Sequence, residues 1–539
     1  MHRRRFLVTV GAAGTAVAGA WAAHAVRARQ GRRAEVLIRG AQLHDGRGGA
    51  ARFGDLAIGQ GRILGVGELT GWSAARTIDA SGRVAAPGFI DAHSHAAEGL
   101  VRRGLHTAEA LIAQGVTTIV ANPDGGGPLD LIAQRARMAT LGVGVNVAPL
   151  IGHGVVRAAV LEMADRAPTA PELERMQQHV RDGLRAGAFG LSSGLFYAPG
   201  SYARTDEVVA LMRIVAQAHG RRGLHTSHIR DEGTYTVGLL AAVDEIITIA
   251  ESTTTTGVVS HIKALGPDVW GKARDCAAHI EAARTRGVSV YADQYPYEAS
   301  STSLAAAVLP RSAQAGGRAA LDGRLADPAT RAALLPEVRE NIRRRGGPAS
   351  LVIAFHPPDR RLEGQSLEQV ATARRMPPEE AALAVIAVRD PSIVSFNMAL
   401  ADIEFLMRQP WTMTCSDGAI FLPGEGKPHP RGHGAFTRKL TAFVRDRHTV
   451  PLEQALRSMT SLPAEVLSLS GRGVLEEGAH ADVVVFDPAA LRDQATYQDP
   501  HRHASGMSFV FVNGQPALDE GRPTGVTAGL LLRREESRR

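Results

Sequence analysis

Cysteine is scarce in this sequence. The 539 residues include only two, Cys276 and Cys415. Two cysteines cannot build a disulfide framework or a zinc site made of thiolates alone. Each is therefore expected to be a small buried apolar side chain, and the sequence does not specify whether they pair.

Long apolar runs and dense basic blocks are also missing. After the N-terminal segment, no stretch has the length and composition of a membrane-spanning helix. The net charge is +7, but the interior has no run of five or six Lys and Arg, no zinc-finger spacing and no basic stretch with interleaved aromatic residues. These absences exclude the common signatures of a nucleic-acid partner. The 44% hydrophobic and 21% charged content is ordinary for a globular protein with a large core.

The N-terminus carries a targeting pattern. Arg3-Arg4-Arg5-Phe6-Leu7 matches the twin-arginine motif, and an apolar run rich in Gly and Ala follows up to Ala23. Ala23-His24-Ala25 offers a cleavage site with small residues. We predict a twin-arginine signal peptide over residues 1–25, with the twin-arginine export machinery as partner, a periplasmic or secreted mature protein and no stable membrane span after cleavage. A general secretory signal or an uncleaved anchor is the alternative.

Short strands and turn residues occupy both ends of the remaining chain. Val36–Gly40, Leu56–Ile58 and Arg62–Gly67 have strand character, as do residues 481–486 and 509–514. We therefore predict a small β-sandwich domain formed from residues 33–86 and 471–529. The charged tail from Gly521 onward is expected to be loose.

Residues 87–470 alternate short apolar strands with helical stretches, which is typical of parallel βαβ units. Eight candidate strands end near Asp91, Ala121, Gly152, Ser193, His228, His261, Asp293 and Asp417. Eight units predict an α/β fold, a (β/α)8 TIM-type barrel, whose active site lies at the C-terminal ends of the strands. The long interval between strands seven and eight predicts an inserted subdomain at about 300–385.

Histidines stand at three of these strand ends. His93 and His95 follow the first strand as His-x-His, and alternate residues of a strand share one face, so both imidazoles can hold one divalent ion. His228 ends strand five and His261 ends strand six. Because the strands converge at this face, we predict that all four histidines are metal ligands. His225 is expected to be structural.

Asp417 ends strand eight, in Ser416-Asp417-Gly418. A carboxylate in this place can take a proton from an attacking water and give it to the leaving nitrogen. A turn aspartate before glycine is the alternative. The four histidines nearby favour the catalytic role.

These motifs together resemble the D-aminoacylases (N-acyl-D-amino-acid deacylases) of the amidohydrolase superfamily, over about residues 35–529. Beyond His-x-His, the resemblance is carried in order by Gly190–Gly200, His228-Ile229-Arg230-Asp231-Glu232, Ser260–Lys263, Trp270–Lys272, Asp293–Tyr297, Ser416–Gly418, His429–Arg431 and Gly434–Arg438. The resemblance implies one or two divalent ions, with zinc expected, and Asp417 as the catalytic acid and base. It also implies that Lys263 and Tyr295 bind substrate near the scissile bond.

The chain departs from the family pattern after strand two. The family has a cysteine ligand in a Gly-Asn-Cys-Gly turn, whereas this chain has Asn122-Pro123-Asp124-Gly125, with Asp124 where the cysteine would be. A carboxylate can bind or bridge divalent metals and accepts ions other than zinc. We predict that Asp124 is a ligand; a turn residue in a Pro-Asp-Gly corner is the alternative.

The predicted activity is metal-dependent hydrolysis of the amide bond of an N-acyl-D-amino acid or a closely related D-residue amide. The substrate carboxylate needs a cationic clamp, for which Lys263, Arg431 and Arg230 are candidates. Tyr197 and Tyr295 are candidates to donate to the carbonyl or to pack against the acyl chain. We also place His153, after strand three, in this group, with a structural role as its alternative.

Three rival functions follow from the same sequence. Two are related enzymes, a D-residue or isoaspartyl dipeptidase and a cyclic-amide hydrolase. The binuclear centre of hydantoinases uses a carboxylated lysine at the end of strand four, where this chain has Ser192-Ser193. The third is a non-catalytic periplasmic binding protein, against which the complete histidine set and Asp417 argue.

Overall fold

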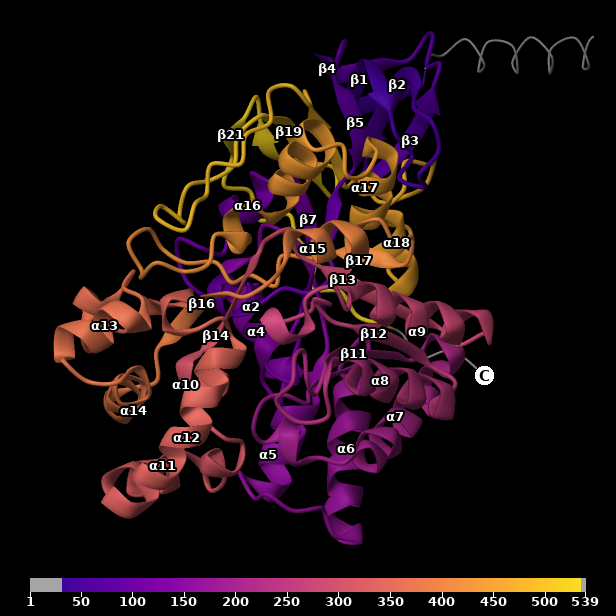
Figure 1. Ribbon diagram of the computed structural model, residues 1–539. Coiled ribbons are helices and arrows are strands. Elements are labelled where there is room, and N and C mark those ends of the chain that lie inside the picture. Colours follow the sequence, from indigo (N-terminus) through magenta and orange to yellow (C-terminus); the bar gives the residue numbers. More distant parts are fainter. Residues whose placement is uncertain (1–31, 535–539) are drawn as a thin grey trace, which may run out of the picture.

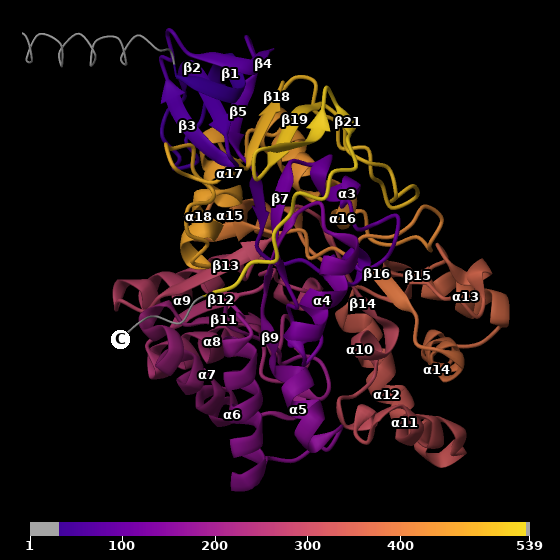
Figure 2. The ribbon, with the colours of Figure 1, turned by 180° about the vertical axis from the view of Figure 1, so that it is seen from behind.

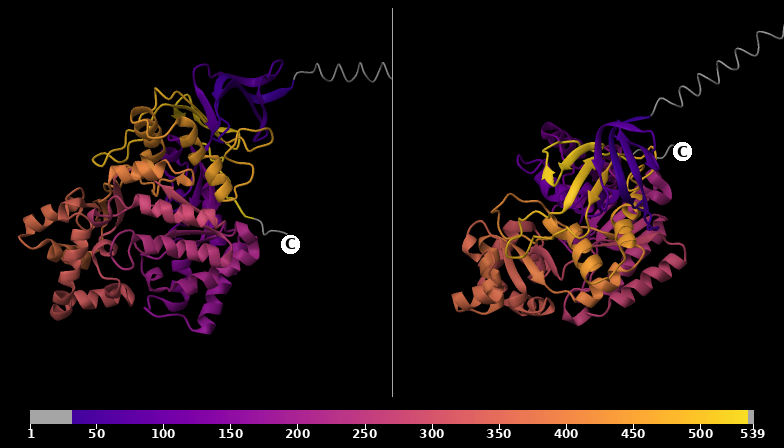
Figure 3. Two further views of the ribbon diagram at one scale, coloured as in Figure 1. Left: turned by 45° about the vertical axis from the view of Figure 1, so that its right-hand side comes forward. Right: turned by 90° about the horizontal axis from the view of Figure 1, so that it is seen from above.

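The computed structural model describes residues 32–534, so the predicted signal peptide lies outside the described residues. Figure 1 shows three parts: a sheet domain built from the first and last segments, a central barrel, and an insertion to one side. Figure 3 shows the insertion standing apart from the sheet domain in two further views. No helix among residues 32–534 is long and apolar enough to span a bilayer.

The barrel strands are short and almost entirely buried, as expected for parallel strands covered by helices on the outside. In the strand over residues 116–121, for example, every side chain is buried. In ring order the strands are β6 (Phe89–Asp91), β7 (Val116–Ala121), β8 (Asn146–Pro149) continued by β9 (Ile151–Gly152), β10 (Leu191–Gly194), β11 (Leu224–His228), β12 (Thr256–Val259), β13 (Val290–Gln294) and β17 (Thr412–Thr414).

Two parallel ladders make up this ring, β6-β7-β8 and β9-β10-β11-β12-β13-β17. They meet at Leu150, whose N–H donates to Ala121 O at 3.0 Å, while the next residue, Ile151, donates to Gly190 O at 3.0 Å. On the other side, Ala92 N–H donates to Thr414 O at 3.4 Å, which joins β6 to β17. The eight strand positions therefore form a closed barrel.

Helices cover the outside of the barrel and connect its strands. Local signals fix their ends: α6 begins with a capping box in which Thr169 and Glu172 satisfy the first backbone N–H groups. The helices are α2 (Ala97–Leu100), α3 (Glu109–Ile112), α4 (Leu131–Leu141), α5 (His153–Leu161), α6 (Ala170–Arg185), α7 (Thr205–His219), α8 (Leu239–Thr253), α9 (Ala273–Thr285), α15 (Leu400–Met407), α16 (Arg431–Arg438), the π-helix η7 (Lys439–Asp446), α17 (Leu452–Met459) and α18 (Ser461–Val466).

The sheet domain draws its strands from both ends of the chain. They are β1 (Arg33–Leu43), β2 (Arg52–Gly59), β3 (Arg62–Gly67), β4 (Ser73–Asp79), β5 (Val84–Pro87), β18 (Val483–Phe486), β19 (Met507–Val512), β20 (Gln515–Asp519) and β21 (Arg522–Pro523). The predicted sheet domain from both ends of the chain is present, and its strands are joined in one nine-stranded sheet. β1 pairs with β2, β4 and β5, so the sheet branches at this strand and encloses one apolar core.

The insertion follows β13 and has its own core. It contains β14 (Ala299–Ser303), α10 (Leu304–Val308), α11 (Gly317–Ala326), α12 (Pro328–Arg344), β15 (Leu351–Phe355), α13 (Leu367–Arg374), α14 (Pro378–Val388) and β16 (Ser392–Phe396). Its end lies beyond the expected residue 385, because β16 is the central strand of its three-stranded sheet, between β14 and β15. The insertion therefore returns to the barrel close to where it left it.

The described part of the C-terminal segment, up to residue 534, pairs with the barrel, contrary to the expectation of a loose tail. Val147 N–H donates to Leu530 O at 2.9 Å, and Leu532 N–H donates to Val147 O at 2.9 Å. Figure 2 shows this yellow segment running from the sheet domain along the barrel. The tail extends the β8 edge and joins the two domains.

Both cysteines are buried and unpaired, as expected of small core side chains. Burial raises the pKa of the Cys276 thiol to about 12. Neither thiol is therefore poised to react as a thiolate at neutral pH.

Candidate metal centre and active site

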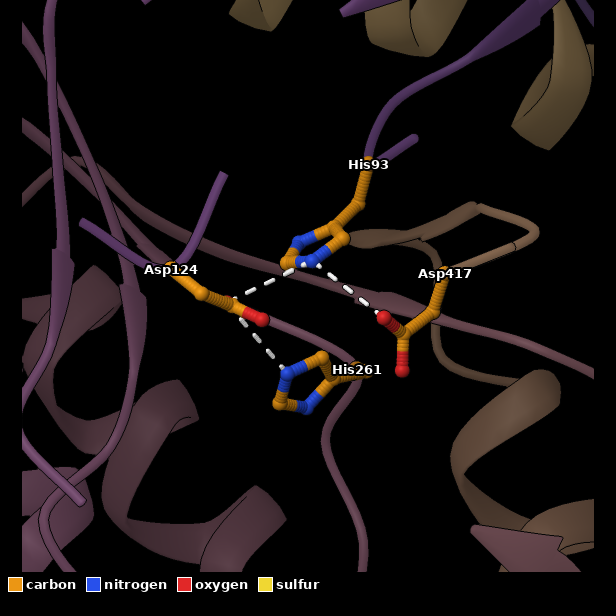
Figure 4. A group of neighbouring side chains, drawn as sticks. All are labelled: His93, Asp124, His261 and Asp417. Atoms are coloured by element: carbon orange, nitrogen blue, oxygen red, sulfur yellow. Dashed lines mark ion pairs between the residues drawn. The ribbon is translucent and has the colours of Figure 1, made fainter. Parts of the chain in front are cut away.

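Four side chains from different strand ends converge at the C-terminal face of the barrel (Figure 4). His93 Nε2 lies 3.4 Å from Asp124 Oδ1 and 3.5 Å from Asp417 Oδ1. His261 Nε2 lies 3.6 Å from Asp124 Oδ1. The other oxygen of Asp124, Oδ2, lies 3.4 Å from His95 Nε2. The Asp124 carboxylate therefore stands between three of the four predicted histidine ligands.

A second group adjoins the first and shares His261 with it. His228 Nδ1 lies 2.9 Å from His261 Nε2. Glu232 faces both rings, with Oε2 at 3.6 Å from His228 Nε2 and Oε1 at 3.1 Å from His261 Nδ1. All four predicted histidines and both predicted aspartates thus gather in one place.

Several nitrogen and oxygen atoms in this centre are buried without a hydrogen-bond partner. His93 Nε2, Asp124 Oδ1 and His228 Nε2 accept or donate no hydrogen bond within residues 32–534. Unpaired buried polar atoms are costly and rare. Imidazole nitrogens and carboxylate oxygens are suitable ligands for zinc and similar divalent ions. The residues present therefore fit a divalent cation.

The protonation of the histidines supports this fit. Burial lowers the pKa of His95, but the carboxylates of Asp124 and Asp417 outweigh it and raise that pKa to about 9. Burial and Lys263 lower the pKa of His261, yet nearby carboxylates raise it to about 10. The carboxylates of the centre thus favour a positive charge there. A metal ion that binds to these histidines must displace the protons on their imidazole rings.

The backbone at the strand ends is strained. Asp124, His261 and Asp417 have φ values of 56°, 36° and 50°. Residues other than glycine rarely adopt such values, and they concentrate at functional sites where the surrounding structure enforces them. These three residues are among those whose side chains gather in the centre.

Buried aspartates fix the strand ends from behind. Asp91 accepts the Ser416 N–H at 2.8 Å and also the Ser416 hydroxyl, which positions the residue before Asp417. Asp293 accepts the His261 N–H at 2.7 Å. Burial raises the pKa of Asp91 to about 6, although these hydrogen bonds oppose the rise.

Asp417 is held as a carboxylate. Burial would raise its pKa, but Arg431, whose Nη1 lies 2.5 Å from Asp417 Oδ2, and His261 keep the pKa well below the usual range. A group in this state can accept a proton.

A cavity of about 250 Å³ opens above the centre. Its wall includes four of the predicted substrate-binding residues, which are Tyr197, Lys263, Tyr295 and Arg431. The Lys263 ammonium contacts Glu232, and the guanidinium of Arg431 lies 4.9 Å from the centroid of the Tyr295 ring. The Tyr295 hydroxyl is buried and has no hydrogen-bond partner within residues 32–534.

A second cavity, of about 720 Å³, is also lined by His95 and Asp124. Both cavities share these two residues and also Tyr197, Thr302, Ala419 and Phe421. Gly125 and Gly194 line the second cavity. The metal centre therefore stands between two spaces, one with several charged side chains on its wall and one with many glycines.

Comparison with known proteins identifies the family. The profile described as "Amidohydrolase family" matches residues 76–517. The chain belongs to the amidohydrolase family. An N-acyl-D-glutamate deacylase and a D-aminoacylase, both of Alcaligenes xylosoxydans xylosoxydans, are each 34% identical to this amidohydrolase over 93% of its length, covering 97% and 98% of the two relatives.

A solved structure is similar over the same extent. It is the N-acyl-D-glutamate deacylase from Bordetella bronchiseptica, in complex with zinc and a phosphonate that mimics the tetrahedral intermediate of the reaction. It has a TM-score of 0.78 and 34% identity over 93% of this chain and 100% of that chain. The predicted barrel fold and the predicted resemblance to D-aminoacylases are confirmed.

Two predicted substrate-binding residues of the amidohydrolase lie elsewhere. The His153 ring is fully buried, and its Nε2 lies 2.8 Å from Glu207 Oε1. The same glutamate also pairs with Arg157. Arg230 binds Glu245 on α8, with Nη2 at 2.7 Å from Oε1. Neither residue lines the two cavities. In the structure their partners therefore lie on the helices around the barrel and not in either cavity.

Glu232 is a residue of the amidohydrolase centre that sequence reasoning missed. It lies four residues after His228 and contacts His228, His261 and Lys263. The signal was present in the motif from His228 to Glu232, but an acidic residue after a strand gives no indication of which way it turns.

The end of strand four carries no metal ligand. The Ser193 hydroxyl bonds to His225 Nε2 at 2.8 Å and donates to the Ser227 hydroxyl at 2.8 Å, while Ser192 donates to Asn122 O at 2.7 Å. Burial lowers the pKa of His225 to about 3. These residues form a neutral hydrogen-bond network inside the barrel, in agreement with the structural role expected of His225.

Proposed function

We propose that this amidohydrolase cleaves the amide bond of N-acyl-D-amino acids to a carboxylate and a free D-amino acid, with one or two divalent ions, zinc being the expected metal. The observation that carries the proposal is the convergence of His93, His95, His228 and His261 with two aspartates beneath a cavity that contains fixed positive charges. Similarity over 93% of the chain to enzymes named for this reaction supports it.

In this proposal His93, His95, Asp124, His228 and His261 hold the metal, and Glu232 lies within reach of the same ions. A divalent ion in such a site polarises the amide carbonyl and lowers the pKa of water. Asp417 accepts a proton from the attacking water at its carboxylate and passes it to the leaving nitrogen. Arg431 keeps Asp417 ionised before the reaction.

Lys263, Tyr295 and Tyr197 orient the substrate. The Lys263 ammonium and the free Tyr295 hydroxyl both face the cavity and can donate to the α-carboxylate or to the amide carbonyl. Tyr197 stands between the two cavities, so it can separate the acyl group from the amino-acid part. The cavity around Gly125 and Gly194 has room for the acyl group.

The hydrolysis of a panel of N-acetyl-D- and N-acetyl-L-amino acids tests the proposal. We expect at least about tenfold higher kcat/KM for the D-enantiomers, and loss of activity after chelation with recovery on adding zinc, cobalt or manganese. Equal rates for both enantiomers of methionine would contradict D-specificity. Hydrolysis of cyclic amides or isoaspartyl dipeptides alone would favour the rival enzymes, and metal binding without any turnover would favour the binding protein.

We also propose export by the twin-arginine route, which delivers the enzyme to the periplasm or the medium already folded and with its metal bound. The support is the motif Arg3-Arg4-Arg5-Phe6-Leu7 and the apolar run after it.

Replacing Arg3 and Arg4 together with lysine should keep the protein in the cytoplasm, because that route requires the arginine pair. Cell fractionation followed by immunoblotting measures this. Arg33→Lys, outside the motif, is the matched control and should be exported normally. Periplasmic accumulation of the double variant would instead indicate a general secretory signal.

A further inference from the structure

One positive charge on the wall of the cavity above the metal centre has no carboxylate partner. Arg345 directly follows α12 of the insertion and is only 2% exposed. Its Nη1 forms no hydrogen bond within residues 32–534, although the side chain lines the cavity. Buried charges are normally paired, because removing an unpaired charge from water is strongly unfavourable.

The other buried arginines of the described chain do have acidic partners. Arg157 pairs with Glu207, Arg431 with Asp417 and Arg472 with Asp482. The remaining cation on the cavity wall, Lys263, contacts Glu232. Arg311 Nη2 is also buried without a hydrogen-bond partner, but this residue does not line the cavity. Arg345 is therefore the exception among the cations that line this cavity.

The guanidinium of Arg345 is fixed in place by neutral groups. Its Nε donates to the Tyr235 hydroxyl at 2.7 Å. The loop of Tyr235 is held by Asp231, whose carboxylate accepts the N–H groups of Gly233 at 2.9 Å and Gly238 at 3.0 Å. These bonds occupy Asp231, so the loop positions Arg345 without neutralising it. The free edge of the guanidinium is left for a ligand.

We propose that Arg345 binds a carboxylate in the side chain of the substrate, so that N-acyl-D-amino acids with acidic side chains, D-glutamate and D-aspartate, are the preferred class. This inference rests on the proposed function. A carboxylate can take two parallel hydrogen bonds from a guanidinium, and the pair is strong when water is excluded. Lys263 and Arg431 remain at the other charged part of the cavity, which leaves them for the α-carboxylate.

The test compares N-acetyl-D-glutamate with N-acetyl-D-glutamine, which has the same shape without the charge. For the metal-loaded wild-type enzyme we expect kcat/KM to be at least about 100-fold higher for the glutamate derivative. Arg345→Met should lower this ratio by about 100-fold or more, whereas Arg345→Lys should restore part of it. N-acetyl-D-aspartate and N-acetyl-D-asparagine form a second pair with a shorter side chain.

Arg343→Gln is the matched control, because Arg343 lies two residues earlier and pairs at the surface with Asp268 at 2.7 Å. It should leave the ratio unchanged. Thermal unfolding shows whether Arg345→Met is folded, and a folded variant that loses activity equally on both substrates would overturn the proposal by assigning Arg345 a structural role. Wild-type turnover of N-acetyl-D-methionine but not of acidic substrates would overturn this inference alone. Failure with every N-acyl-D-amino acid would instead refute the proposed function.

Discussion

Asp417→Asn is expected to lower kcat by about 10²- to 10⁴-fold, while the purified protein keeps its metal. Asparagine preserves the size and shape of the side chain but cannot accept a proton from water. The acidic partner of Arg431 is lost at the same time, but the histidines and Asp124 that face the metal position are unchanged. Steady-state kinetics and elemental analysis of the same sample measure the two effects separately.

A surface carboxylate provides the control for this variant. Asp182→Asn lies on α6, more than half exposed and paired only within that helix, so it should change neither rate nor metal content. Activity of Asp417→Asn within a few-fold of wild type would remove Asp417 from the mechanism. Loss of the metal together with the activity would instead indicate that Asp417 is a metal ligand.

Asp124→Asn is expected to reduce metal content or affinity, and with it activity, by at least about tenfold. The carboxylate presents one oxygen to His93 and His261 and the other to His95, so it can bridge two ions held by different histidines. The neutral amide offers one weak oxygen ligand and cannot bridge. Asp124→Cys should recover zinc binding in part, because a thiolate is a strong zinc ligand.

The alternative role of Asp124, as a turn residue only, predicts the opposite results. If its purpose is the turn of Pro123-Asp124-Gly125, asparagine should replace it almost without effect, since asparagine tolerates the positive φ of 56°. Cysteine, which tolerates it less well, would then only destabilise the fold. Unchanged metal stoichiometry and turnover in Asp124→Asn would therefore withdraw Asp124 from the centre.

The barrel and the centre of the site were predictable because both depend on local patterns. Each of the eight predicted strand ends lies within three residues of an observed one. Once the strands close into a ring, the last residues of each strand must face a common axis, whatever the rest of the chain does. His93, His228 and Asp417 were expected to lie near one another for this reason, and they belong to two adjoining groups that share His261.

The errors share a different origin, which is that they depend on partners far away in the sequence. His153 and Arg230 also stand beside strand ends, but in the structure they contact Glu207 and Glu245 on neighbouring helices. Arg345 had no local signal at all, because only the folding of the insertion brings it to the cavity. The tail was misjudged for the same reason, since its pairing with Val147 joins residues that are far apart in the chain.

The sheet shared by both ends of the chain limits the order in which the protein can fold during its synthesis. Pro87 in β5 pairs with Val483 in β18, and the ribosome needs on the order of tens of seconds to make the residues between them. Throughout that interval β5 has an unpaired edge, and unpaired edges recruit other chains. The β8 edge of the barrel is also completed late, because it pairs with Leu530 and Leu532, which are among the last described residues to be synthesised. The sheet domain and this edge of the barrel can therefore be completed only after β18 and the C-terminal segment have been synthesised.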